Sequence, residues 1–97
     1  MKNIHFEKDN NVIVCDGQLT ITNISKGVEK TLIKLLDAKV TELDLAKVVK
    51  FDTAGLALLL LAIEKSQSLN TKITFTNVSE EIYKLAKLSG VDSFLLD

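Results

Sequence analysis

The side chains best suited to catalysis are few and far apart in the sequence. His5 is the single histidine and Cys15 the single cysteine, and both lie in segments that alternate as β-strands do. A serine–histidine–aspartate or cysteine–histidine arrangement would therefore need partners from distant parts of the chain. We interpret His5 as an exposed strand residue and Cys15 as a small apolar one.

Two aspartates, Asp44 and Asp52, could in principle act as paired carboxylates in acid–base catalysis. Asp44, however, alternates with Leu43 and Leu45, so it should point outward to backbone or solvent. The four glycines lack the spacing of a phosphate-binding loop, and a single cysteine cannot build a multi-thiolate metal site. The sequence predicts a protein that is not an enzyme and has no metal and no cofactor.

Composition and length describe one small domain spanning residues 1–97. The chain is 46% hydrophobic and 26% charged, which suits a globular domain with one modest core. A net charge of -1 argues against binding nucleic acid through a basic surface. No apolar run reaches the roughly 20 residues needed to cross a bilayer, and the first thirty residues do not resemble a signal peptide. We expect a cytoplasmic protein.

The N-terminal third is predicted to form strands. Residues 4–6 and 12–14 flank a turn-forming segment, residues 9–11, which predicts a β-hairpin. Residues 16–17 form a second break. Residues 19–21 are then either a third short strand or a continuation of the second past a bulge.

The remaining two-thirds alternates between helix and strand. The predicted elements are a helix starting near residues 25–28, a strand at 43–45, a helix starting at 52–54, a strand at 73–75 and a helix from 79 to 89. Such alternation implies parallel strands joined by helical crossovers. The predicted fold class is α/β, a small mixed sheet with an N-terminal antiparallel hairpin followed by parallel strands, covered by about three to four helices.

The helix after Asp52 is the most apolar segment of the chain. On a helical wheel, one group of its residues would cover the sheet: Leu56, Leu59, Leu60 and Ile63. A second group points roughly the opposite way: Ala54, Leu58 and Leu61. A helix that is apolar all round in a small domain predicts either a surface for a partner or self-association.

Two residues at the start of this helix carry polar groups. Asp52 or Thr53 can cap the free backbone N–H groups of its first turn, which would be a purely structural role. A hydroxyl at a helix N-terminus, followed by a glycine, also suits a contact with a partner or a phosphate.

These segments together resemble the STAS domain family, which includes anti-sigma factor antagonists and the cytoplasmic tails of sulfate transporters. The resemblance rests on residues 43–45, residues 52–56 with the leucine-rich helix that follows, and residues 88–91. It covers nearly the whole chain. Within the family the chain looks most like the small stand-alone STAS subunit (MlaB-type) of the Mla phospholipid-transport ABC system, on residues 52–60 and 83–88.

The resemblance implies a binding module without chemistry of its own. It implies binding to the cytoplasmic ATPase of an ABC transporter and, through it, to the permease. That complex maintains outer-membrane lipid asymmetry, so the protein would associate peripherally with the inner membrane and would not insert into it. Thr53 would be the key contact, within a partner-binding set that also contains Asp52, Ala54, Gly55, Leu58 and Leu61.

The alternative within the family is an anti-sigma factor antagonist that binds an anti-sigma kinase. The phosphorylated residue of those proteins is typically the serine or threonine directly before the glycine, and here that position is Ala54. Thr53 offers the only hydroxyl for phosphorylation or a regulatory contact at this site. This departure favours a constitutive subunit. Direct lipid binding is a weaker alternative, because the chain has no basic amphipathic helix.

Overall fold

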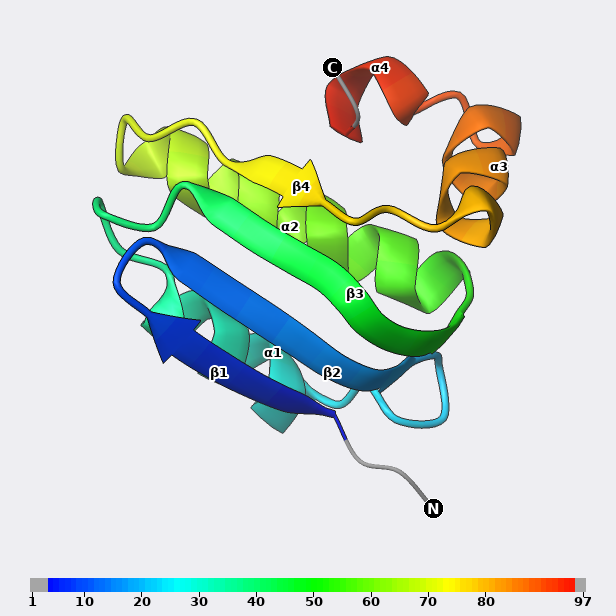
Figure 1. The fold of residues 1–97 in the computed structure, drawn as a ribbon, viewed down its shortest axis with the longest axis horizontal. Coiled ribbons are helices and arrows are strands. Elements are labelled where there is room, and N and C mark those ends of the chain that lie inside the picture. Colours follow the sequence, from blue (N-terminus) through cyan, green and yellow to red (C-terminus); the bar gives the residue numbers. More distant parts are fainter. Residues whose placement is uncertain (1–3, 96–97) are drawn as a thin grey trace.

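A four-stranded mixed sheet is the framework of the protein. The structure, a computed structural model, describes residues 4–95. The elements in chain order are β1 (His5–Asp9), β2 (Val12–Leu19), α1 (Lys26–Leu35), β3 (Glu42–Phe51), α2 (Thr53–Ser68), β4 (Thr74–Thr76), α3 (Glu80–Leu88) and α4 (Asp92–Leu95). The strand order is β1-β2-β3-β4, with β1 antiparallel to β2 and the other pairs parallel (Figure 1). The predicted fold class is therefore confirmed.

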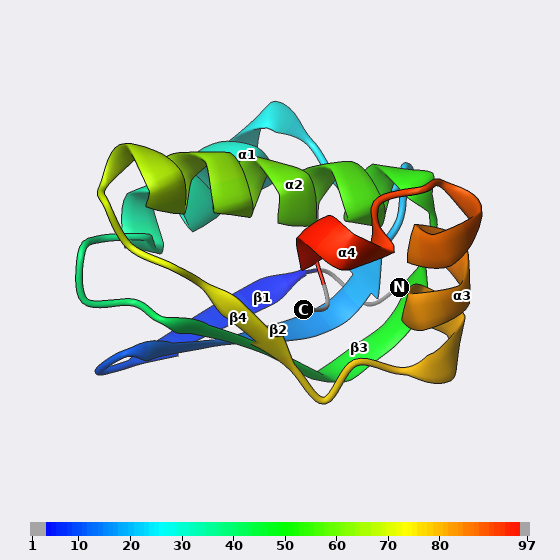
Figure 2. The ribbon, with the colours of Figure 1, turned by 90° about the horizontal axis from the view of Figure 1, so that it is seen from above.

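The helices form a second layer on one face of this sheet. Figure 2 shows α1 and α2 side by side above the strands, with α3 and α4 beyond α2 at the β4 side. No element described by the structure lies on the opposite face. The core between the two layers is built from odd-numbered residues of β2, such as Ile13 and Leu19, and from the leucines of β3, α1 and α2, as strand alternation requires.

The predicted hairpin is confirmed, and the ambiguous segment after it is resolved. Asn10 adopts a φ of 56° in the turn between β1 and β2, a left-handed conformation that asparagine tolerates. The second strand continues past Gly17, which has a φ of 121°, and ends at Leu19. Register shifts against β3 flank this glycine. Residues 12–19 are therefore one irregular strand, and residues 19–21 do not form a separate strand.

Local capping groups begin and end α3, close to the bounds of 79 and 89 that the sequence predicts. The Ser79 hydroxyl oxygen accepts a hydrogen bond from the N–H of Ile82 at 3.2 Å. At the other end Gly90 has a φ of 75°. The N–H of Val91 donates to the carbonyl of Ala86 at 3.0 Å, the longer hydrogen bond of a Schellman motif. These caps set the length of α3 and thus its position beside the start of α2.

The outward-facing side predicted for α2 is wrong for Leu58, which is 2% exposed. Leu61, on the same side one turn later, is half-buried and lines a groove against Ile33 of α1. The prediction failed because it considered α2 alone on the sheet. In the structure α1 lies in the same layer (Figure 2) and covers this side of the helix. Leu58 is therefore a core residue and does not belong to a partner surface.

We predict that Leu58→Ala destabilises the fold by about 2–5 kcal/mol, since it removes a fully enclosed side chain and leaves a cavity. Leu61→Ala should cost roughly 1 kcal/mol, because its side chain is already partly in contact with water. Urea unfolding followed by circular dichroism measures both. Equal losses for the two variants would contradict the burial difference on which this assignment rests.

Candidate partner-binding site

The candidate site lies where β3 passes into α2, at the carboxyl ends of the parallel strands. The backbone N–H of Asp52 donates to the carbonyl of Leu19 at 3.3 Å, so β3 is held against β2 up to the first residue of the turn. Figure 1 shows the loop after β2, the β3–α2 turn and α3 at this same edge of the molecule. Three segments that are distant in the sequence therefore meet around Asp52.

The Asp52 carboxylate organises this edge. Its Oδ1 accepts hydrogen bonds from the N–H groups of Ala54 at 2.9 Å and Gly55 at 3.4 Å, which caps α2. Its Oδ2 accepts from the N–H of Ile21 at 3.0 Å. One side chain thus satisfies donors of both the helix and the neighbouring loop.

Because Asp52 is the N-cap of α2, the Thr53 side chain does not cap the helix. Thr53 is the first residue of α2 and is exposed. Its hydroxyl has no hydrogen-bond partner among residues 4–95. The structural alternative, in which Thr53 only caps the helix, is therefore excluded, and its hydroxyl is available to another molecule. Ala54 beside it is half-buried.

Gly55 has a packing role. A Cβ at this position would lie 2.5 Å from the carbonyl oxygen of Leu19 and 2.7 Å from Cε1 of Phe51. Gly55, a member of the predicted partner-binding set, is buried and supports the site through packing. Only a residue without a side chain lets the first turn of α2 approach β2 this closely.

An open groove runs between the start of α2 and α3, and we call it the α2–α3 groove. Its volume is about 660 Å³. The residues that line it are Phe51, Asp52, Thr53, Glu80, Glu81, Lys84, Leu85 and Leu88. Leu88, the last residue of α3, is 86% exposed.

Sequence reasoning missed two apolar residues at this edge, Leu88 and Ile21. Leu88 lies off the stripe formed by Ile82 and Ala86, the buried residues of α3, and a helical wheel of residues 80–88 would have revealed it. Ile21 is 71% exposed in a loop rich in threonine and asparagine, and no local pattern signals its contact with Asp52. Together with Thr53 they give this edge both apolar and polar contact groups.

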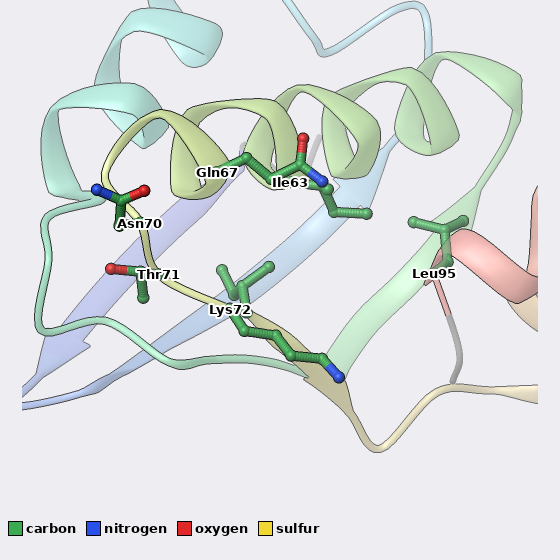
Figure 3. Close-up of a pocket in the computed structure, with 7 residues that line it drawn as sticks. Ile63, Gln67, Asn70, Thr71, Lys72 and Leu95 are labelled. Carbon is green, nitrogen blue, oxygen red and sulfur yellow. The ribbon is translucent and has the colours of Figure 1, made fainter.

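A second hollow lies at the opposite end of α2 and differs in chemistry. It has a volume of about 450 Å³ and is lined by Ile63, Gln67, Asn70, Thr71, Lys72, Ile73 and Leu95 (Figure 3). Lys72 is the one ionisable side chain in this lining. The hollow therefore lacks the pair of titratable groups that acid–base catalysis needs.

The residues first considered for catalysis are not free to act as a catalytic group, because Cys15 is buried and Asp44 is already hydrogen-bonded. Cys15 is buried, and burial followed by the nearby charge of Asp44 raises the pKa of its thiol to about 12. His5 is exposed on β1, with its Nε2 atom 3.6 Å from Glu7 Oε1. Asp44 accepts hydrogen bonds from the Asn77 side chain and the Ala46 N–H, both at 2.9 Å, and these hold its pKa below the usual value.

Two further kinds of functional feature are absent from the part of the chain that the structure describes. Within residues 4–95 no cluster of histidine, cysteine, aspartate and glutamate is arranged to hold a metal ion. None of the helices described is both long and apolar enough to cross a membrane.

We predict that Gly55→Ala destabilises the fold by about 1–3 kcal/mol, because the added methyl group overlaps backbone and a buried ring. Gly27→Ala is the matched control. Its Cβ would meet only Ser25 Oγ, at 3.5 Å, so it should be neutral or stabilising by up to ~1 kcal/mol. Thermal unfolding of both variants tests this. Equal stability of the two alanine variants would refute the close approach at Gly55.

We also predict that Cys15 resists alkylation in the folded protein at about pH 8, because the thiolate is the reactive form. Mass spectrometry after iodoacetamide treatment should show labelling only when urea unfolds the chain. Burial raises the pKa of the Cys15 thiol from its ordinary value of 9.0 in the unfolded chain to about 12 in the folded protein. Its contribution to stability is therefore complete below pH 9 and is lost as the pH rises toward 12. Rapid labelling of the folded protein would contradict this prediction.

Comparison with known proteins supplies a family for this architecture. A sequence model of the STAS domain matches residues 2–96. Two curated relatives, each named "Intermembrane phospholipid transport system binding protein MlaB", from Escherichia coli K12 and Shigella flexneri, are 37% identical over 57 residues. The match covers 59% of this chain and 59% of each relative, so somewhat less than two-thirds of their length is spanned.

A solved structure shares the fold at low sequence identity. The unphosphorylated form of the anti-sigma factor antagonist SpoIIAA aligns with a TM-score of 0.66 at 16% identity. The alignment covers 97% of this chain and 86% of that one. At this identity the likeness concerns the arrangement of strands and helices alone.

Proposed function

Because the chain belongs to the STAS domain family, we propose that it is the non-catalytic STAS subunit of an ABC phospholipid transporter of the Mla type. In this role it binds the cytoplasmic ATPase subunit, supports assembly and activity of the complex, and contributes to outer-membrane lipid asymmetry. Its association with the inner membrane is peripheral and runs through the ATPase and the permease. The likeness to the two MlaB proteins of phospholipid transport systems supports this choice within the family.

The observation that carries the proposal is the unpaired Thr53 hydroxyl at the rim of the α2–α3 groove. The hydrogen bonds of the Asp52 carboxylate hold Thr53 in place, and the Thr53 side chain takes no part in them. Ala54 lies beside it and Leu61 lies further along α2. Thr53 is therefore the central contact with the ATPase, Asp52 and Ala54 surround it, and Leu61 is at most peripheral. A binding role without catalysis agrees with the separation of Cys15 and His5 from this edge.

An anti-sigma factor antagonist is the second candidate function, and the fold shared with SpoIIAA is compatible with it. In that case the α2–α3 groove would receive an anti-sigma kinase, and Thr53 would be the hydroxyl open to phosphorylation. Ala54 counts against this candidate, because it occupies the position directly before Gly55 and has no hydroxyl.

Capture from native membranes distinguishes the two candidates. The tagged protein, purified in mild detergent, should recover an ABC ATPase together with its permease. Recovery of a soluble kinase in their place would support the anti-sigma candidate and reject the transporter role. Recovery of neither would reject both as stated.

We predict that Thr53→Ala weakens binding to the purified ATPase subunit by about three- to tenfold, the range expected for one lost hydrogen bond. Thr53→Ser, which keeps the hydroxyl, should restore most of the affinity. Isothermal titration calorimetry measures both, with circular dichroism to verify that each variant is folded. Undiminished binding by Thr53→Ala would remove this residue from the interface.

A further inference from the structure

The rim of the α2–α3 groove is acidic although the protein as a whole is nearly neutral. Its lining contains the carboxylates of Asp52, Glu80 and Glu81 and one ammonium group, that of Lys84, which leaves a net charge of -2. The entire chain has a formal net charge of -1. The lining of this groove is therefore more acidic than the chain as a whole.

The charges on α3 are available to another molecule. Glu81 is exposed and its carboxylate has no partner among the described residues. Glu80 pairs with Lys84 one turn later at 3.2 Å, but both side chains are at least 70% exposed. Such an exposed pair contributes little to stability, so a cation from a partner can displace Lys84 at small cost.

The floor of the groove is apolar. Phe51 is buried, Leu85 is half-buried and Leu88 is exposed, so the surface passes from the core of the domain to solvent along α3. A partner side chain seated there would shield Leu88 from water. Acidic groups around an apolar floor match a segment that has apolar residues on one face and basic residues beside them.

Resting on the proposed function, we propose that the part of the ATPase subunit that docks in the α2–α3 groove is a basic amphipathic segment. Its apolar side chain packs on Phe51, Leu85 and Leu88, and its lysine or arginine lies against Glu81 and Glu80. The acidic rim speeds association with this partner and disfavours acidic competitors, while the apolar floor slows dissociation.

The first test measures association rates with the purified ATPase subunit by biolayer interferometry. Glu81→Gln should slow association about two- to fivefold at about 0.1 M NaCl. At about 1 M NaCl the substitution should have almost no effect, because the Debye length is then only ~3 Å and the charges are screened from one another. Glu64→Gln is the matched control, because Glu64 is an exposed glutamate of α2 outside the groove. The proposal would be overturned by an association rate that is the same at both salt concentrations, or by one that increases with Glu81→Gln.

The second test addresses the apolar floor through dissociation rates. Leu88→Ala should raise the dissociation rate about tenfold, as expected for a side chain buried by the partner. Val49→Ala serves as its control, since Val49 is 62% exposed and does not line the groove. Equal dissociation rates for the two variants would show that Leu88 is not covered.

A third measurement separates this inference from the proposed function. We would add a synthetic amphipathic peptide of leucine and lysine, or its leucine and glutamate counterpart, and follow backbone amide signals by NMR. Only the lysine peptide should shift the signals of Thr53, Glu81 and Leu88. If it does so while the ATPase fails to bind wild-type protein, the charge preference stands and the transporter role fails. If the two peptides act alike, the charge preference fails, whatever the ATPase does.

Discussion

The hydrogen bonds to the Asp52 carboxylate determine the geometry of this edge of the protein. They join the first turn of α2 to the loop after β2, through the N–H groups of Ala54, Gly55 and Ile21. The close approach of Gly55 to the carbonyl of Leu19 acts on the same two segments. A carboxylate that accepts several backbone donors holds a turn more firmly than a hydroxyl does. Thr53 is displayed in a defined orientation because its neighbours on both sides are restrained.

Apolar side chains of α2 are buried by the sheet below the helix and by α1 beside it in the same layer. The sheet covers one side of the helix and α1 covers another, so Leu58 and Leu59 are both buried. In a chain of 97 residues a single core has little apolar surface to spare. The middle of α2 therefore contributes to the core. The first turn of α2 and the outer face of α3 are the parts of these helices that stay accessible to a partner.

Much of the fold follows from local signals in the sequence. The turn at Asn10, the cap at Ser79 and the stop at Gly90 each depend on neighbouring residues, and all were predictable for that reason. The exposed position of Thr53 at the start of α2 was also expected from the sequence, whereas its contact with a partner is a proposal. By contrast, the burial of Leu58 depends on α1, more than twenty residues earlier in the chain, and a helical wheel contains no such information.

The groove illustrates why the second half of the site could not be predicted. Glu81 and Leu88 line the same groove as Thr53 only because β4 adds to the sheet beside β3 and directs α3 back along the start of α2. This juxtaposition is set by strand order and by the caps of α3, which are separated from Thr53 by the whole of α2 and β4. A rigid first turn on one wall and a capped helix on the other also limit the entropy that binding must remove. That preorganisation favours a groove built from helix ends over one built from loops as the docking surface of so small a domain.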